Sequence, residues 1–347
     1  MTPRLLVRAD AGPRVGTGHV MRCLALAQAQ RDAGGAVTFV TAPGQPPIEA
    51  RLRDEGCEVA SVTGSPGSLE DAAATAALAA TCGATWIVVD GYHLDEAFHA
   101  RLRGGGVRLL ALDDGAPRRH VADLVLNQNL HADASDYADR APHTELLLGV
   151  RHVLLRREFA PFRDEPPAPV ARVARRVLVT LGGSDPDDVT STLLDALQQA
   201  DVDALHATVL VGAANPRLAA LRARAARTPN VEVLSSVSDV ARRLGEVDLA
   251  VTSGGTTVWE LAFRGVPAIV GAIAPVEERL LAGLRSLGLF EVVGAFADTD
   301  ATSLAARIGL LSRDAPRRER MRALGRATVD GRGAERVLEA MRHKEAT

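Results

Sequence analysis

The stretch Leu5-Leu-Val-Arg-Ala-Asp-Ala-Gly-Pro-Arg-Val-Gly-Thr-Gly-His-Val-Met-Arg-Cys-Leu24 decides the fold of this chain. It begins with a short apolar run, passes through a glycine-rich turn and continues with apolar residues at helical spacing, up to Gly34-Gly35. A strand that leads through a glycine turn into a helix is typical of the βαβ units of parallel sheets. We therefore predict a strand at residues 5–7 and a helix at residues 20–33.

The same order returns in the second half of the chain. A strand is predicted at residues 177–180, a turn at Gly182-Gly183 and a helix from about Asp188. Other apolar runs of strand length are found at residues 37–41, 86–89, 107–112, 124–126, 208–211, 231–234, 249–252 and 268–270. The alternation of strands and helices in two similar halves predicts an α/β protein with two Rossmann-like domains that face each other across a cleft.

A proline-rich segment separates the two halves. Residues 163–169 contain three prolines, which suit neither a helix nor a central strand, so we interpret the segment as a linker. The predicted domains are residues 1–160 and residues 170–335. A charged, amphipathic helical segment is predicted at about residues 316–343, and the tail beyond about Ala334 either packs back across the domains or is solvated.

Composition and charge argue against several classes of protein. With 347 residues the chain is longer than one ordinary domain, and 47% hydrophobic residues provide a large core. Its 40 basic and 43 acidic residues give a net charge of −3, so we expect neither nucleic acid nor an anionic membrane as partner. Three unpaired cysteines and a charged N-terminal stretch predict a cytoplasmic protein without a signal peptide or membrane span. We expect a monomer or weak dimer.

The first glycine turn suits an anion, because a loop before a helix offers free backbone N–H groups and the positive end of the helix dipole. Gly16 and Gly18 match two glycines of a dinucleotide fingerprint, but Met21 stands in the third position. The next strand ends in Val40-Thr41, without the acid that would bind a ribose, and no Walker loop occurs. The sequence therefore predicts no cofactor.

His19 lies where the first helix begins. Histidine can exchange a proton near neutral pH, so His19 is a candidate general base. The alternative is a histidine that only caps or packs at the turn. Asp10, at the end of the first strand, could orient the imidazole, hold a substrate hydroxyl or cap the loop. Arg22 is a candidate binding residue one turn further along the helix.

Two further glycine turns follow strands in the second half, at Leu181-Gly-Gly-Ser-Asp185 and at Thr252-Ser-Gly-Gly-Thr-Thr-Val-Trp-Glu260. Paired glycines let a ligand approach the backbone closely, and hydroxyls at a helix N-terminus suit a diphosphate. Glu260, one turn into its helix, could bind a ribose diol. The candidate binding residues of these turns are Gly183, Ser184, Ser253, Gly254, Gly255, Thr256, Thr257 and Glu260.

Polar residues also follow the middle strands of the first half. The stretch Asp90-Gly-Tyr-His-Leu-Asp95 contains two carboxylates and a histidine, but an ordinary polar loop explains it better than a metal site. Asp113-Asp114-Gly115 is likewise interpreted as a strand-end turn, so no metal is predicted. Tyr92 could face the cleft and contact the substrate, and Asn127 either lines the cleft or belongs to the turn.

Together these stretches resemble the UDP-sugar hydrolases of pseudaminic acid biosynthesis. That family is related to spore-coat polysaccharide proteins and to inverting glycosyltransferases with the GT-B fold. The resemblance runs from Arg8 to about Gly288. It is carried by residues 16–24, 123–129, 147–156, 181–185 and 253–261.

The resemblance implies a metal-independent hydrolysis, in which water displaces UDP, with inversion, from the anomeric carbon of a 2,4-diacetamido-2,4,6-trideoxy sugar. It places the catalytic histidine of the family on His19, and nucleotide binding on residues 253–260 with Gly183 and Ser184. One stretch departs from the family. Ile273-Ala-Pro-Val-Glu-Glu-Arg279 lacks the usual Asn-Gln motif, which leaves the identity of the sugar open.

Two alternatives share the same nucleotide pocket. A glycosyltransferase would transfer the sugar to an acceptor hydroxyl instead of water, with the same base and leaving group. A sensor would bind the nucleotide-sugar without turnover, although His19, Asp10 and Glu260 together favour catalysis. In each case the expected partner is a small-molecule nucleotide-sugar.

Overall fold

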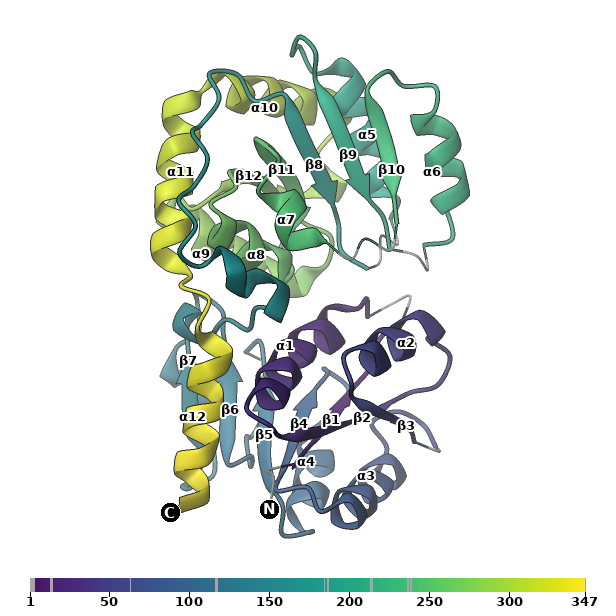
Figure 1. Cartoon of the computed structure of the whole chain (residues 1–347), viewed down its shortest axis with the longest axis vertical. Coiled ribbons are helices and arrows are strands. Elements are labelled where there is room, and N and C mark those ends of the chain that lie inside the picture. The colour runs from purple at the N-terminus through teal and green to yellow at the C-terminus, as the bar shows by residue number, and fades with distance from the viewer. Residues whose placement is uncertain are drawn as a thin grey trace. The chain divides into compact units, whose positions relative to one another are not determined.

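The computed structural model describes residues 4–12, 15–62, 64–115, 118–183, 185, 187–212, 215–235, 237 and 239–346. The chain divides into two compact units. The first unit consists of Met1–Gly12, His19–Arg157 and Gly331–Thr347, and the second consists of Pro13–Gly18 and Glu158–Asp330. Each unit contains a sheet with helices packed against it (Figure 1).

The described residues of the first unit form seven parallel strands in the order β3-β2-β1-β4-β5-β6-β7. The strands are β1 (Arg4–Ala9), β2 (Ala36–Thr41), β3 (Glu58–Ser61), β4 (Trp86–Asp90), β5 (Arg108–Leu112), β6 (Leu124–Asn127) and β7 (Glu145–Leu148). The helices are α1 (Gly18–Asp32), α2 (Pro46–Asp54), α3 (Leu69–Cys82), α4 (Glu96–Arg103) and the C-terminal α12 (Gly333–Ala346), with short 3-10 helices at Ala134–Tyr137 and Val150–His152.

In the second unit, the part of the chain that the structure describes forms six parallel strands in the order β10-β9-β8-β11-β12-β13. The strands are β8 (Arg176–Thr180), β9 (His206–Leu210), β10 (Val231–Leu234), β11 (Leu249–Ser253), β12 (Ala268–Ala272) and β13 (Glu291–Ala295). The helices are α5 (Val189–Gln199), α6 (Leu218–Ala225), α7 (Val240–Leu244), α8 (Thr257–Arg264), α9 (Glu278–Leu287), α10 (Ala301–Arg313) and α11 (Ala315–Thr328). The prediction of a two-domain, Rossmann-like α/β fold is confirmed.

Strand order reverses once in each sheet. In the first unit the chain moves outward from β1 to β3 and then returns to β4, on the other side of β1. In the second unit the same reversal separates β8 from β11. Ligands of open α/β sheets bind at the carboxyl ends of the strands beside such a reversal, because the connecting loops diverge there. The predicted glycine turns follow β1, β8 and β11, so all three lie at these reversals.

The central strands are buried on both faces, as is usual for parallel sheets. In β1, Leu5 and Val7 pack with α1 on one face, whereas Leu6 belongs to a separate core on the other. This explains why the central strands are continuous apolar runs that the sequence predicts well. The strands that prediction missed are β3, β7 and β13, which are short and only partly buried.

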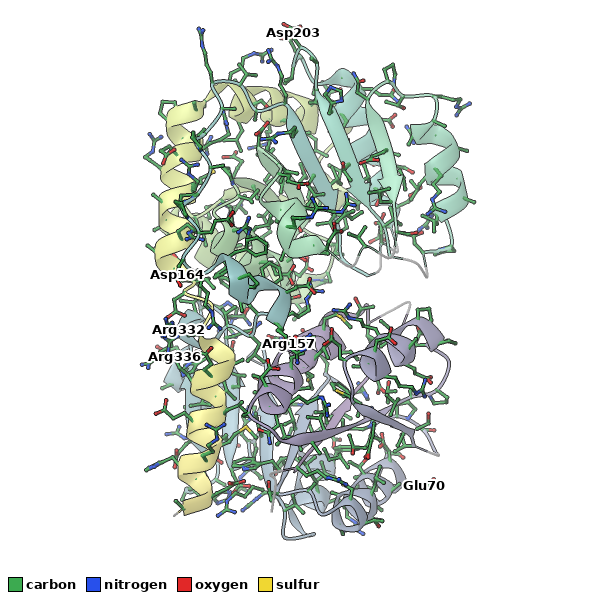
Figure 2. The ribbon with its side chains drawn as sticks, viewed as in Figure 1. Glu70, Arg157, Asp164, Asp203, Arg332 and Arg336 are labelled. Atoms are coloured by element: carbon green, nitrogen blue, oxygen red, sulfur yellow. The ribbon has the colours of Figure 1, made fainter. Side chains whose placement is uncertain are left out.

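The prediction of one helical segment at residues 316–343 is wrong. The structure breaks it into α11 and α12, and Gly331 between them adopts a φ of 74°, a left-handed conformation that interrupts a helix. Val337, Leu338 and Met341 of α12 pack into the core of the first unit. Arg336, labelled in Figure 2, donates a hydrogen bond to the Arg151 carbonyl (2.8 Å).

The proline-rich segment at residues 163–169 runs beside α11 and is part of the second unit (Figure 1). Three arginines of α11 bind its backbone carbonyl groups and those of the adjoining residues. Arg326 donates to Phe162, Arg163 and Glu165, Arg322 donates to Ala168, and Arg318 donates to Ala171 and Arg172. These hydrogen bonds satisfy backbone carbonyl groups that do not belong to a β-sheet, and they fix the segment to its unit.

Within the described residues, none of the helices combines the length and apolar character that spanning a bilayer requires.

Candidate functional site

A histidine–aspartate pair lies at the strand reversal of the first unit. His19 is the second residue of α1, and its Nδ1 lies 2.7 Å from Oδ1 of Asp90, the last residue of β4. The side chain of Asp90 is fully buried, and that of His19 is 11% exposed. A carboxylate at Nδ1 favours the tautomer with its proton on that nitrogen, which leaves Nε2 as the acceptor. His19 can therefore accept a proton at Nε2.

Arg22 fixes the carboxylate of this pair. It follows His19 by three residues, so both side chains lie on the same face of α1. Its Nε donates to Oδ2 of Asp90 (2.5 Å) and its Nη2 to Oδ1 (2.7 Å), a bidentate arrangement. Burial alone would raise the pKa of Asp90, but the charges of Arg22 and His19 outweigh it and hold the pKa below its usual range. The ionised Asp90 can thus stabilise a protonated His19.

A second carboxylate extends the network. Asp114, just beyond β5, accepts hydrogen bonds from Nη1 of Arg22 (2.9 Å), the hydroxyl of Tyr92 (2.9 Å) and Nδ2 of Asn129 (2.8 Å). The Tyr92 ring is 50% exposed and meets the His19 ring edge-on, with centroids 5.0 Å apart. Burial, and then the charge of Asp114, raise the pKa of Tyr92 above its usual value, so the phenol stays protonated. Tyr92 thus covers one side of His19.

The structure corrects the role predicted for Asn127. This residue ends β6 and is fully buried. Its Nδ2 donates to the hydroxyl of Tyr137 (2.8 Å), and its Oδ1 accepts from the backbone N–H of Asn129 (3.0 Å). Because its amide is used inside the protein, Asn127 supports the turn that carries Asn129 and does not line a binding surface.

The structure also corrects the proposal that Asp10 orients the imidazole of His19. The Asp10 carboxylate accepts hydrogen bonds from Arg8 Nη1 (2.6 Å), the Ala42 backbone N–H (2.6 Å) and His93 Nε2 (2.9 Å). Burial would raise the pKa of Asp10, but hydrogen bonds from His93 and Arg8 outweigh it, and the net shift is downward. The residue that contacts Nδ1 of His19 is Asp90, which the sequence had led us to interpret as part of an ordinary polar loop.

The stretch from Asp90 to Asp95 divides its polar groups among three tasks. Asp90 holds His19, His93 contacts Asp10, and the Asp95 carboxylate accepts from the Phe98 N–H (2.9 Å) as the N-cap of α4. Among the described residues, no group of three or more His, Cys, Asp or Glu side chains is placed to hold a metal ion.

In the second unit, the turn after β8 contains Gly182 and Gly183. Gly182 has a φ of 80°, which favours glycine, and a Cβ on Gly212 would lie only 2.5 Å from the Gly183 carbonyl oxygen. The start of α5 beyond this turn is already capped, because the Asp185 carboxylate accepts from the N–H groups of Val189 and Thr190 (both 2.9 Å). The predicted binding residue Ser184 lies outside the described residues.

The turn after β11 has a different character. Ser253 ends the strand, Gly254 to Thr256 form the turn and α8 begins at Thr257, with no side-chain cap from Thr256. A Cβ on Gly254 would lie 2.6 Å from Leu281 Cδ1, so a larger residue would force its surroundings to shift, whereas a Cβ on Gly255 would come no closer than 3.7 Å to its nearest neighbour. Glu260 is half-buried in the first turn of α8. The predicted residues of this turn therefore lie together at the strand reversal.

Glu277, which lies just before α9, contacts this turn. Its Oε2 accepts hydrogen bonds from the backbone N–H groups of Ile273 (2.8 Å) and Gly254 (3.3 Å). Burial raises the pKa of Glu277 above its usual range, although these N–H groups partly offset the shift. The stretch that departs from the resembled family thus places a carboxylate against the third glycine turn.

The glycine turn at Pro13–Gly18 is grouped with the second unit, whereas His19 belongs to the first. Within its described part, Gly16 has a φ of 69°, a conformation that favours glycine, and Gly18 is the first residue of α1.

Two parallel sheets, each with its strand reversal, place the protein among the two-domain α/β proteins with the GT-B fold. Solved structures of this class match nearly the whole chain. MurG of Acinetobacter baumannii has a TM-score of 0.65 and 17% identity over 98% of this chain and 99% of its own. Anabaena Alr3699/HepE in complex with UDP-glucose has a TM-score of 0.63 and 14% identity over 98% and 99%. At these identities the likeness concerns the fold alone.

Curated relatives are distant. A Bacillus subtilis spore coat polysaccharide biosynthesis protein, SpsG, is 27% identical over 62% of this chain and 63% of its own length. The UDP-2,4-diacetamido-2,4,6-trideoxy-beta-L-altropyranose hydrolase of Campylobacter jejuni is 24% identical over 74% and 87%. An uncharacterized Methanocaldococcus jannaschii protein, MJ1062, is 23% identical over 77% and 55%.

The chain thus spans less than two thirds of the length of two of these relatives. No protein-family model matches it. The resemblance that the sequence predicted is confirmed at the level of distant homology, since the matching proteins include a UDP-sugar hydrolase and a spore-coat protein.

Proposed function

We propose that the protein is a nucleotide-sugar hydrolase, which releases UDP from the anomeric carbon of a diacetamido-trideoxy hexose with inversion and without a metal ion. The observation that carries this proposal is the His19–Asp90 pair, fixed by Arg22 at the strand reversal of the first unit. The distant hydrolase relative, matched over 87% of its length, supports the substrate class.

In the proposed reaction His19 is the general base. Its Nε2 takes a proton from water as the water oxygen forms a bond to the anomeric carbon. The bond between that carbon and the diphosphate oxygen breaks on the opposite face, and its electron pair leaves with UDP. Asp90 stabilises the imidazolium by its negative charge, and Arg22 keeps Asp90 ionised and oriented.

The second unit is proposed to bind the leaving diphosphate. The start of α8 offers backbone N–H groups and the positive end of a helix dipole, which stabilise the charge that develops as the bond breaks. Glu260 is proposed to bind the ribose. The other residues proposed to contact the nucleotide-sugar are Gly16, Gly18, Arg22, Tyr92, Gly183, Ser184, Ser253, Gly254, Gly255, Thr256 and Thr257.

A glycosyltransferase is the second candidate, and it is favoured by the fold that the chain shares with proteins such as the Rickettsia africae glycosyltransferase (TM-score 0.63, 11% identity). An acceptor hydroxyl would replace water, whereas His19 and the leaving group would keep their roles. The two candidates differ in one measurable property, which is whether UDP is released without an acceptor.

The test is to incubate the protein with UDP-2,4-diacetamido-2,4,6-trideoxy-β-L-altropyranose and a panel of UDP-, CMP- and GDP-sugars, with EDTA, and to follow products by proton NMR. Release of UDP and an inverted free sugar without acceptor would establish the hydrolase. UDP release only after an acceptor is added would replace it with the transferase. Tight binding without any turnover would support a sensor, and loss of turnover in EDTA would overturn metal independence.

A further inference from the structure

A second histidine–aspartate pair lies at the same sheet edge as His19 and Asp90. His93 Nε2 lies 2.9 Å from Oδ2 of Asp10, and the His93 side chain is 32% exposed. The contact fixes one nitrogen of the ring against a buried carboxylate. The proposed reaction does not use this pair.

The two pairs cross between neighbouring strands. His19 follows β1 and contacts Asp90 at the end of β4, whereas His93 follows β4 and contacts Asp10 at the end of β1. Ala9, next to Asp10, is the register partner of Asp90, and adjacent strands are about 4.8 Å apart. Tyr92, the residue before His93, contacts the His19 ring. Both imidazoles therefore belong to the strand reversal at which ligands of such sheets bind.

The Asp10 carboxylate that contacts His93 is held in place by the buried Arg8 guanidinium. Arg8 is fully buried and donates to Asp10 (2.6 Å) and, through Nε and Nη2, to both oxygens of Asp71. Asp71 in turn accepts from the Gly67 backbone N–H (2.9 Å) and so ties the loop beside His93 to the same arginine. The low pKa of Asp10, held down against burial by the hydrogen bonds of His93 and Arg8, keeps it ionised. The Nε2 side of His93 is thus set by rigid, buried partners.

Two glycines pack against the His93 ring, Gly91 beside Nδ1 and Gly67 beside Cδ2. A Cβ on Gly91 would lie 2.8 Å from Cε1 and 3.1 Å from Nδ1 of His93, and a Cβ on Gly67 would lie 3.0 Å from Cδ2. Any larger residue at Gly91 would cover Nδ1 or displace the ring. The local sequence therefore places at this edge an imidazole whose Nε2 is bound to Asp10 and whose Nδ1 lies beside the backbone of Gly91, and among the described contacts no hydrogen bond involves that Nδ1.

We propose that His93 is a specificity-determining residue, which binds a hydroxyl or acetamido group of the sugar through Nδ1, and that Asp10 is its positioning residue. The inference rests on the proposed function only in taking a nucleotide-sugar as ligand. It assigns His93 to the sugar and not to the nucleotide, so its removal should weaken the binding of a UDP-sugar and leave UDP binding unchanged.

Two amide variants separate this role from a structural one. In His93→Gln the amide nitrogen takes about the place of Nε2, so the bond to Asp10 can persist while the group at Nδ1 is lost. In His93→Asn the amide takes about the place of Nδ1, so the sugar contact can persist while the bond to Asp10 is lost. A sugar-binding role predicts the larger defect in His93→Gln, and a structural role predicts it in His93→Asn.

The experiment is calorimetric titration with UDP and with UDP-2,4-diacetamido-2,4,6-trideoxy-β-L-altropyranose, in a His19→Ala background that prevents turnover. We expect His93→Gln to weaken UDP-sugar binding about 10-fold, as for one lost hydrogen bond to a polar ligand, with UDP binding within twofold. His93→Asn should lose less. His143→Asn is the matched control, because His143 is exposed and its imidazole contacts a backbone carbonyl, that of Val121.

Equal affinities of His93→Gln and the background for the UDP-sugar would overturn the inference, and so would a larger defect in His93→Asn accompanied by a lower melting temperature. Failure of the proposed hydrolysis is a separate result, since it appears as absent UDP release in the wild-type protein while the titrations still decide the role of His93.

Discussion

The strand reversals of the two units differ in the chemical groups that surround them. In the first unit the groups are charged side chains, and Arg22 donates hydrogen bonds of 2.5–3.1 Å to the carboxylates of Asp90 and Asp114. In the second, glycines, hydroxyls and the backbone at the start of α8 form the turn, and Glu277 is the carboxylate bound there. Side-chain networks suit proton transfer, and backbone N–H groups suit an anion. The comparison therefore supports the proposal that the first unit carries the chemistry and the second unit binds the nucleotide.

The largest expected effect concerns His19. We expect His19→Ala to lower kcat for UDP release about 10³-fold or more, because general base catalysis typically contributes 10²–10⁴-fold. Binding of UDP, measured by calorimetry, should stay within twofold of the wild-type value. An equal loss of turnover and of UDP affinity would break the comparison and make His19 a structural residue.

Acid should act first on the first unit. His99 on α4 is fully buried, and burial, followed by the charges of Arg118 and His120, lowers its pKa to about 3. Since the unfolded chain binds this proton near pH 6.5, the stability that neutral His99 provides is complete above that pH and is lost as pH falls toward 3. The carboxylates with lowered pKa, Asp10, Asp90 and Asp114, lose their contribution at still lower pH.

The expected loss from His99 is about 2 kcal/mol at pH 5, from 1.36 kcal/mol per pKa unit. The two tryptophans allow each unit to be followed by fluorescence, since Trp86 lies in β4 and Trp259 in α8. Single-tryptophan variants, Trp86→Phe and Trp259→Phe, should show the first unit unfolding at the higher pH. His99→Leu should remove the part of this dependence above pH 4, and coincident transitions in both variants would contradict the prediction.

The residues at the two strand reversals could not be predicted equally well from the sequence. The turn after β11 was predicted residue by residue, because its glycines and hydroxyls are contiguous in sequence. Of the pair in the first unit, the sequence pointed to His19 and not to Asp90. The two residues are separated by 71 positions and meet only because β4 returns to the side of β1. Asp10 was chosen for its place in the sequence, although both aspartates end neighbouring strands. Strand order, which short motifs do not encode, decided between them.

The third prediction tests whether UDP binds at the turn after β11, by adding a methyl group to Gly254. Gly254→Ala would place a methyl group 2.6 Å from Leu281 Cδ1 and 3.0 Å from Glu277 Cβ, so the turn or the side chains packed against it must shift. Overpacking of this kind typically costs 1–3 kcal/mol, and we expect UDP affinity to fall about 10-fold. Gly309→Ala in α10 is the control, because the nearest atom to its new methyl group is the end of the flexible Arg313 side chain at 3.3 Å, and the Asp201 backbone lies at an ordinary contact distance of 3.9 Å. A Gly254→Ala protein with unchanged UDP affinity would remove this turn from the binding site.

The smallest expected effect concerns charge in the second unit. Glu277 holds a carboxylate against the Gly254 N–H, where the proposed diphosphate would bring more negative charge. Glu277→Gln keeps the size and an acceptor oxygen but removes the repulsion, so UDP affinity should rise about threefold at low salt and less at high salt. The exposed neighbour Glu278 supplies the control, as Glu278→Gln makes the same change in net charge.

The pH dependence of this effect has a definite sign. Burial raises the pKa of Glu277, so lowering the pH neutralises the wild-type carboxylate earlier than that of an exposed glutamate. The advantage of Glu277→Gln over the wild-type protein should therefore shrink as pH falls from 7 toward 5, in titrations with UDP. Weaker binding by Glu277→Gln than by Glu278→Gln would mean that the carboxylate supports the turn more than it repels the ligand. The second reversal would then depend on a charged side chain, as the first does.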